Sequence, residues 1–289
     1  VGCAIIGQTS NLAPADKKLY SIRDIVGTVE SLPLITSSIL SKKIASGLSS
    51  LVLDVKVGNG SFNSTIDIAR DLSNSLVRVA KGAGLHCEAI LTDMNQVLGK
   101  SAGHTLEILE CIKYIKNDFK DHRLEKITNE LISSLLVNIY KISKEEAYNK
   151  INTVINNGLA AEKFEMMVAA LGGPKNILTS YEKDLTNTSI QKDIFSMEGG
   201  WIENIHTREL GLILIELGGG RKQVTDKINY GVGYDNVLNI GDEVNSSTPL
   251  LSLYSSKNID DNLINKIKGC FIISDKKTQK LSEIFETIN

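Results

Sequence analysis

The sequence predicts an α/β protein whose sheet is mixed, mainly parallel and flanked by helices. Short apolar runs such as 51–57 alternate with helical patterns such as 64–81, an order typical of this class. The range 103–172 is almost wholly helical in pattern. After about residue 193 the pattern changes to short β-like runs broken by glycines, which indicates a smaller C-terminal α+β subdomain.

The first part of the chain is predicted to contain one strand and two helices. Residues 2–7 have the apolar composition of a buried strand, and a turn-forming stretch follows them. Helices are expected over 16–26 and 33–46, with Ser31 as a cap ahead of Pro33. Because the first strand has no cap, helix or turn ahead of it, we expect the chain to be a piece of a longer protein.

The middle and the end of the chain repeat the strand and helix patterns. The run 51–57 is almost uninterrupted in its apolar residues, so we expect a strand buried on both faces. An amphipathic helix over 64–81 and a strand over 88–92 follow, and Ser143 with Glu146 has the form of a capping box. The C-terminal subdomain should contain strands at 201–205, 230–237, 249–254 and 271–274 and a helix at 207–217.

Composition excludes several classes of protein. The chain has 32 Lys and Arg against 34 Asp and Glu, without a block of like charge, so no broad positive field would attract nucleic acid or a membrane. It has no apolar run of about 18 residues and no signal-peptide pattern. Its four cysteines lack CxxC spacing and a partnered histidine pair, which disfavours disulfides and zinc and favours the cytoplasm.

Two predicted helices carry polar side chains at helical spacing. Tyr20 and Arg23 are three residues apart, and Ser38 and Lys42 are four apart, so each pair lies on one helix face. Together they could hold a planar ligand with carbonyl oxygens and an N–H, because Arg and Lys only donate hydrogen bonds while Ser donates or accepts. From spacing alone, a solvated helix face remains the other interpretation.

Several long motifs occur in an order that identifies a family. They are IGQTSNLAPADKKLY at 6–20, SLPLITSSILSKK at 31–43, LVLDVKVGNG at 51–60, LTDMNQVL at 91–98, AAEKF at 160–164, TRELG at 207–211 and GGGRK at 218–222. With these motifs the chain resembles the pyrimidine nucleoside phosphorylase family over nearly its whole length.

The resemblance implies phosphorolysis of thymidine or deoxyuridine, with inorganic phosphate as co-substrate and no cofactor. The base-binding residues of the family correspond to Tyr20, Arg23, Ser38 and Lys42. Arg23 and Lys42 would act in catalysis, because cationic donors stabilise the negative charge that grows on the departing base. Relatives are homodimers, so a homodimer of the full-length form is expected.

The resemblance also implies a domain organisation. The first strand of the α/β domain would occupy 1–14, a partial helical lobe with the base-binding residues 15–48, the α/β core 49–193, and the C-terminal subdomain 194–289. The family's phosphate-binding Lys-x-Ser-Thr-Gly-Gly loop does not occur in this sequence. We therefore expect this chain to be inactive alone. Either the N-terminal part was removed or is encoded separately, or the chain is a relic that folds without turning over substrate.

Other residues are weaker candidates. Asp93 and Met94 follow a predicted strand and could line a pocket, although a helix-capping Asp is the alternative. Some relatives hold a monovalent or calcium ion, which would place Leu98, Ser101 and Glu110 around it. We favour a surface glutamate at position 110 and no metal.

Two glycine-rich stretches and the remaining reactive side chains receive structural interpretations. We expect a strand-to-helix turn at 58–60 rather than a phosphate cradle, and a helix end at 218–222 rather than an anion nest. The four histidines share no metal-binding spacing, and the cysteines are interpreted as small buried hydrophobic residues.

Two other functions stay open at this point. One is a related phosphoribosyltransferase, against which the Arg23, Ser38 and Lys42 arrangement argues. The other is a non-catalytic protein that binds pyrimidines or assembles with a partner. The choice between thymidine and uridine depends on contacts to the sugar 2′ position, which the sequence does not locate.

Overall fold

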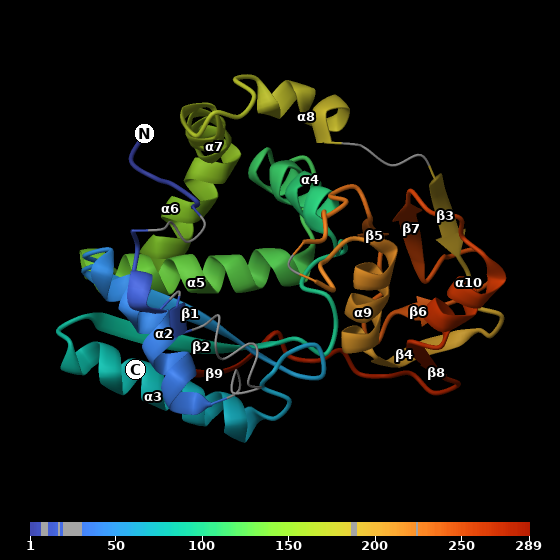
Figure 1. Cartoon of the computed structure of the whole chain (residues 1–289), viewed down its shortest axis with the longest axis horizontal. Helices are drawn as coiled ribbons and strands as arrows, with labels where there is room; N and C mark the ends of the chain where they lie inside the picture. The colour runs from blue at the N-terminus through green and yellow to red at the C-terminus, as the bar shows by residue number, and fades with distance from the viewer. Residues whose placement is uncertain (7–10, 17, 20–30, 186–189, 224) are drawn as a thin grey trace.

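The computed structural model describes residues 1–6, 11–16, 18–19, 31–185, 190–223 and 225–289. It confirms the α/β class. Figure 1 shows an α/β lobe on the left, a C-terminal subdomain on the right, and a group of helices above and between them. In the described ranges, no helix combines the length and the apolar character needed to cross a membrane.

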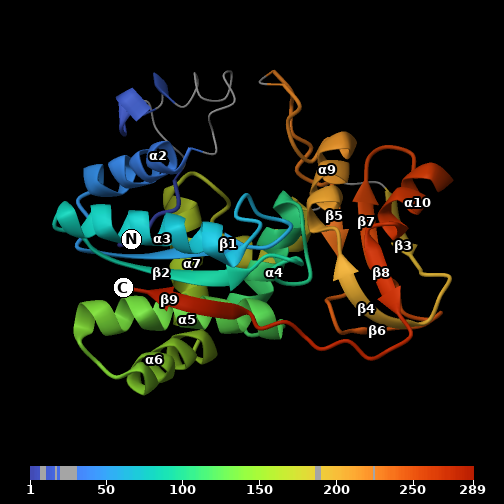
Figure 2. The ribbon, with the colours of Figure 1, turned by 90° about the horizontal axis from the view of Figure 1, so that it is seen from below.

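The α/β lobe contains a mixed sheet of three described strands between two layers of helices. The strands have the order β1-β2-β9, in which β1 and β2 are parallel and β9 is antiparallel to β2. Figure 2 shows α2 and α3 on one face of the sheet and α5 and α6 on the other. The bounds are α2 Leu32–Ala45, β1 Ser50–Val57, α3 Ile66–Gly82, β2 His86–Asp93, α5 His122–Tyr140, α6 Lys144–Asn156 and β9 Ile284–Ile288.

Side-chain caps set the starts of α3 and α6 in this lobe. Thr65 accepts a hydrogen bond from the Ile68 N–H at the start of α3, and Ser143 accepts one from the Glu146 N–H at the start of α6. The second contact confirms the hydrogen bond expected from the capping-box pattern. The buried stripe of α3, which includes Leu72 and Leu76, packs with β1 and β2 in one core cluster.

The strand β1 is buried on one face only, which corrects the expectation of burial on both faces. Val55 and Val57 belong to the core shared with α3, whereas Asp54 on the opposite face is exposed. Its carboxylate pairs with the Lys56 ammonium at 2.7 Å. Alternate residues of a strand point to opposite faces, so the charged pair and the core residues separate cleanly.

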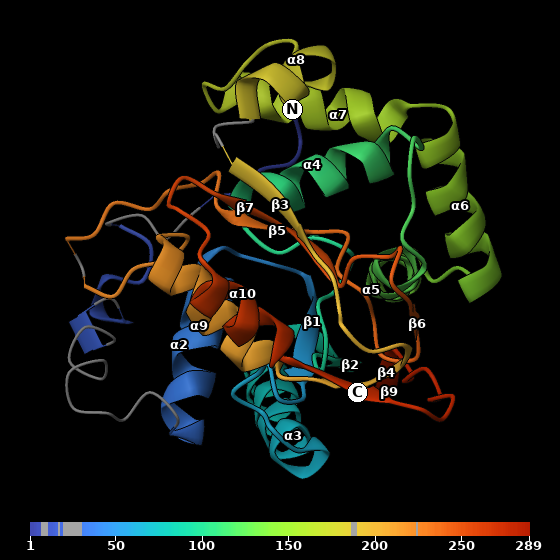
Figure 3. The same cartoon turned by 90° about the vertical axis from the view of Figure 1, so that its right-hand side faces the viewer.

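The remaining helices form a second group. Figure 3 shows α4, α7 and α8 together above the sheet. Ile112 of α4 and Ile177 and Tyr181 of α8 form a small buried cluster that joins them. The bounds of these helices are α4 His104–Ile115, α7 Leu159–Ala170 and α8 Ile177–Leu185.

The C-terminal subdomain consists of two small antiparallel sheets and two helices. The strand orders are β3-β7-β5 and β6-β4-β8. The predicted helix over 207–217 and the predicted strand over 271–274 are confirmed with the same bounds. The elements are β3 Ile190–Ile194, β4 Gly200–Ile205, α9 Thr207–Leu217, β5 Gly233–Asp235, β6 Glu243–Val244, β7 Leu251–Ser255, α10 Asp261–Lys268 and β8 Phe271–Ser274.

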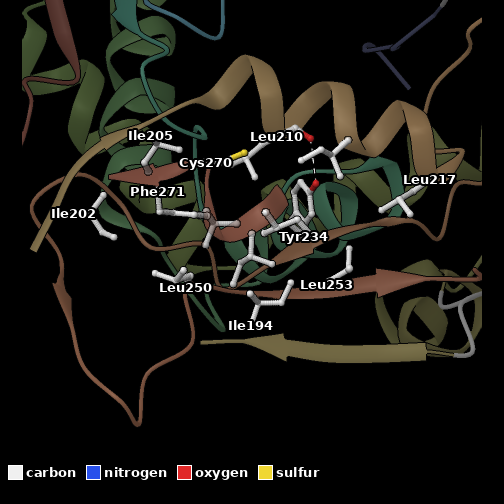
Figure 4. Close-up of a cluster of buried hydrophobic side chains, with 14 of the residues drawn as sticks. Ile194, Ile202, Ile205, Leu210, Leu217, Tyr234, Leu250, Leu253, Cys270 and Phe271 are labelled. Carbon is white, nitrogen blue, oxygen red and sulfur yellow. Dashed lines mark hydrogen bonds between the residues drawn. The ribbon is translucent and has the colours of Figure 1, made fainter. Parts of the chain in front are cut away.

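A large hydrophobic core holds these two sheets and α9 together (Figure 4). Tyr234 lies at its centre and is fully buried, and its hydroxyl donates to the Leu210 carbonyl of α9 at 3.1 Å. This hydrogen bond satisfies the one polar group of the ring, as burial of a tyrosine requires. Burial raises the pKa of the Tyr234 hydroxyl well above its ordinary value, so the ring stays neutral.

Two further observations differ from the sequence-based expectation. Residues 1–6 do not form the strand predicted over 2–7, and Ile5 and Ile6 are exposed. A strand needs a hydrogen-bonded neighbour, and here the segment lies beside α7 instead, where the Lys163 ammonium donates to the Val1 carbonyl at 3.2 Å. In addition, β9 lies in the sheet of the α/β lobe, although the sequence interpretation placed all of 194–289 in the C-terminal subdomain.

Candidate functional site

The helix α2 carries two of the four predicted base-binding residues. It begins directly after Ser31, with Pro33 in its first turn, as the sequence predicts, although the Ser31 side chain makes no capping hydrogen bond. Ser38 and Lys42 are one turn apart on this helix, so their side chains meet, and the Lys42 ammonium donates to the Ser38 hydroxyl at 3.0 Å.

A third residue, which the sequence interpretation missed, joins this pair. The Lys42 ammonium also donates to a carboxylate oxygen of Asp16 at 2.7 Å. The side chain of Asp16 is 9% exposed and that of Lys42 is 27% exposed, so the ion pair is largely shielded from water. Such shielding strengthens the attraction and also makes an unpaired charge costly.

The structure therefore brings Ser38 and Lys42 together. Tyr20 and Arg23 lie outside the described residues, so their positions relative to this pair stay a prediction. The signal that could have found Asp16 is its spacing, because positions 16, 20 and 23 would share one face of a helix.

Asp93 is an internal anchor rather than a pocket wall. Its carboxylate is fully buried and accepts hydrogen bonds from the Asn95 N–H and side chain, the Gln96 side chain at 2.9 Å and the Arg123 guanidinium at 3.1 Å. Gln96 in turn accepts a hydrogen bond from the Ile240 N–H in the C-terminal subdomain. The network fixes the loop after β2 and ties it to both lobes.

Met94 lines a cavity. The cavity has a volume of about 710 Å³ and lies at the carboxyl ends of β1 and β2, against α4 and α9. Open α/β sheets bind their ligands at this end. Its lining is mostly apolar and includes Phe62, which is 71% exposed, and Tyr234.

Two cationic side chains stand at this cavity. The Lys56 ammonium is held by Asp54 at 2.7 Å and by the Thr92 hydroxyl at 3.0 Å. The Arg208 guanidinium, from the first turn of α9, makes no hydrogen bond or ion pair with any residue that the structure describes. Neither Phe62 nor Arg208 was singled out from the sequence, because each becomes notable only when distant loops meet.

Glu110 is buried, which corrects its interpretation as a surface glutamate. One carboxylate oxygen accepts the Lys100 N–H at 2.8 Å and the other accepts the Ser101 N–H at 3.1 Å. Burial raises the pKa of this carboxyl, and the two N–H groups oppose the shift. The two N–H donors tie the Glu110 carboxylate to the loop at 100–101, and the cation site at Leu98, Ser101 and Glu110 stays an untested alternative.

The turn at 58–60 is structural, as predicted. Gly58 has a φ of +135°, and a Cβ there would lie 2.6 Å from the Asn95 nitrogen. Asn59 joins the lobes: its side-chain amide donates to the Ile205 carbonyl at 2.9 Å and accepts the Thr207 N–H at 2.8 Å. These groups face protein partners rather than an anion.

The stretch 218–222 ends α9, which confirms the helix-end interpretation. Gly218 has a left-handed φ of +102°, and the N–H groups of Gly218 and Gly219 donate to Ile215 and Leu214 carbonyls. The Lys222 N–H donates to Asp226 at 2.9 Å. These backbone donors are already used within the turn.

The cysteines fall into two groups. Cys87 and Cys270 are buried as expected, and burial raises the pKa of each thiol to about 11. Cys3 and Cys111 are exposed, so the interpretation as buried hydrophobic residues is wrong for them. Cys111 is exposed because its side of α4 faces open grooves rather than core.

Comparison with known proteins agrees with this architecture. Residues 1–161 match the family described as "Glycosyl transferase family, a/b domain", and residues 201–274 match "Pyrimidine nucleoside phosphorylase C-terminal domain". A thymidine phosphorylase from Colwellia psychrerythraea is 48% identical over 256 residues, which are 88% of this chain and 58% of the relative.

The chain belongs to the pyrimidine nucleoside phosphorylase family. The two family matches follow the structure, since the first covers the chain through the helices α2 to α6 and the second covers β4 to β8. The strand β9, which completes the first sheet, lies beyond both matches. As a family member, the chain spans 58% of the length of the phosphorylase it resembles.

Proposed function

We propose that the protein catalyses phosphorolysis of thymidine or deoxyuridine, releasing the pyrimidine base and 2-deoxyribose 1-phosphate. The observation that carries this proposal is the 48% identity to a thymidine phosphorylase over 88% of the chain. The Ser38–Lys42 pair on α2 supports it, because it offers hydrogen-bonding groups of the types that a pyrimidine edge needs.

The proposed chemistry needs charge stabilisation at the base. A phosphate oxygen bonds to the sugar anomeric carbon while the bond from that carbon to the base nitrogen breaks, and its electron pair moves onto the base. Lys42 and Arg23 would donate to base oxygens whose negative charge grows in the transition state. Tyr20 and Ser38 would orient the ring, with Ser38 meeting the ring N–H.

We further propose that this 289-residue chain does not turn over substrate by itself. It contains no Lys-x-Ser-Thr-Gly-Gly loop, which in the family cradles the phosphate. A base site without a phosphate site can bind pyrimidine but cannot deliver the nucleophile.

The test measures free thymine by chromatography after incubation with thymidine and inorganic phosphate. We expect no release by the chain alone, and phosphate-dependent release when the family's phosphate-loop segment is joined ahead of Val1. In that longer protein Lys42→Ala should lower kcat/KM about 100-fold, the effect of losing one charge-stabilising donor. Lack of phosphate-dependent release by the joined protein would contradict the proposal.

A further inference from the structure

The Lys42 ammonium has three N–H groups, and two of them are used within the protein. One donates to the Asp16 carboxylate at 2.7 Å and another to the Ser38 hydroxyl at 3.0 Å. One N–H is left for a ligand oxygen. Because the Asp16 side chain is only 9% exposed, the ammonium cannot swing freely between this carboxylate and water.

The same contact orients Ser38. An ammonium only donates hydrogen bonds, so the Ser38 oxygen must accept, and its own O–H points elsewhere. Among the described residues, the Ser38 hydroxyl donates to no other group. Lys42 and Ser38 thus offer one free N–H beside a hydroxyl that can still donate and accept. The edge of a pyrimidine dione, where a carbonyl oxygen stands next to an N–H, is complementary to this pair.

We propose that Asp16 is a positioning residue that fixes Lys42 against Ser38 in the arrangement that grips the base. The inference rests on the proposed function of this site. Asp16 lies 26 residues before Lys42, in the helical residues 14–16, so it holds the end of a long flexible side chain from a separate segment. It acts through Lys42 and does not itself touch the base.

A solvated ion pair would behave differently, and α3 offers one for comparison. Asp67 pairs with Arg70 at 2.7 Å within a single helix, but their side chains are 82% and 40% exposed. Exposed pairs of this kind contribute little. The Asp16–Lys42 pair joins two segments of the chain and is shielded from water. It therefore fixes the ammonium that contacts the Ser38 hydroxyl.

The test is calorimetric titration of the 289-residue chain with thymine. Asp16→Asn keeps the size of the side chain but removes its charge, and we expect it to weaken binding at least tenfold, about 1.4 kcal/mol. Asp16→Glu should restore binding to within about threefold, because it returns the carboxylate to the ammonium. Asp67→Asn is the matched control and should bind as the wild type does.

A double variant separates positioning from general stability. In a Lys42→Met chain, Asp16→Asn should cause no further loss of thymine affinity, because its effect passes through the ammonium. If the Asp16→Asn chain binds thymine as tightly as the wild type does, the positioning role is overturned and the proposed function stands. A further loss in the Lys42→Met chain, or failure of Asp16→Glu to restore affinity, would also overturn it. Absence of thymine binding by the wild type would instead refute the base site itself.

Discussion

Replacement of Asp93 by alanine should be among the most destabilising single changes in the α/β lobe. The carboxylate is fully buried and accepts four hydrogen bonds, two from Asn95, one from Gln96 and one from the Arg123 guanidinium. Asp93→Ala leaves all four donors without this acceptor. The Arg123 side chain is only 7% exposed, so its charge would remain inside the protein without its partner.

The magnitude follows from these contacts. A lost neutral hydrogen bond costs about 1 kcal/mol, and one to a charged group about 2 kcal/mol. All four hydrogen bonds end on a charged carboxylate, so their summed loss sets an upper limit of about 8 kcal/mol on the change in the free energy of unfolding. Breaking a buried ion pair by removing one partner costs about 3–5 kcal/mol, and we predict a loss in that range.

Urea unfolding followed by circular dichroism measures the effect. Asp67→Ala is the control, since its pair with Arg70 is exposed and should contribute little. The double variant Asp93→Ala with Arg123→Met should lose less than the sum of the single variants, because the second change removes the orphaned charge. If Asp93→Ala cost no more than the control, the reasoning from burial and hydrogen bonding would be refuted.

Two further outcomes are expected. Gly58→Ala should lower the free energy of unfolding by about 2–3 kcal/mol, because the residue has a φ of +135° and a Cβ would lie 2.6 Å from the Asn95 nitrogen. Gly82→Ala is the control, because a Cβ there has no atom within 4 Å. In the same urea assay it should be neutral or stabilising by up to about 1 kcal/mol. Burial is the largest single influence on the pKa of Glu283 and would raise it. The hydrogen bond from Lys126 at 2.7 Å, a backbone hydrogen bond and the charges of Lys126 and Arg123 together outweigh burial and lower the pKa below its ordinary value of 4.5. Glu283 therefore adds stability above pH 4.5, and this stability is lost as the pH falls through the lower pKa of the folded state. Lys126→Met should make that acid-dependent loss smaller. The measurement is a series of urea unfolding midpoints at different pH values. Lys150→Met, which removes an exposed pair with Glu146, should leave the acid-dependent loss unchanged.

Local sequence signals predicted the elements whose ends are marked by capping residues or by glycine. The bounds of α9 were predicted because apolar periodicity stops at Gly218, which adopts the left-handed conformation of a helix end. The helix α10 was missed although Asp260 caps it and Leu263, Ile264 and Ile267 recur at helical spacing, because its eight residues contain only about two turns. Helical periodicity is recognised over windows of about 11–18 residues, which are longer than this helix.

Pairing between distant segments could not be predicted in the same way. The strand β9 pairs with β2 about 190 residues earlier, and no local pattern encodes that partner. Residues 1–6 were predicted to form a strand that the structure does not contain. Their apolar composition indicates a strand, but composition alone does not supply a neighbouring strand to pair with.

The residues of the candidate site also divide into those that local spacing predicted and those that depend on contacts between distant segments. The spacing of Ser38 and Lys42 placed them together because one helical turn joins them. Asp16 escaped notice because its partner is far along the chain, and Glu110 was taken for a surface residue because the fold, not the helix pattern, buries it. Tyr20 and Arg23 lie outside the described residues and remain predictions.

The return of β9 to the first sheet has a consequence for synthesis on the ribosome. β1 and β2 emerge early, but the strand that covers the second edge of β2 emerges only after the whole C-terminal subdomain has been made. Until then the nascent lobe presents an uncovered strand edge, the kind of surface that invites pairing with another chain. The second edge of β2 therefore stays open to pairing with another chain until β9 has been made, and a chaperone that shields strand edges would act in that interval.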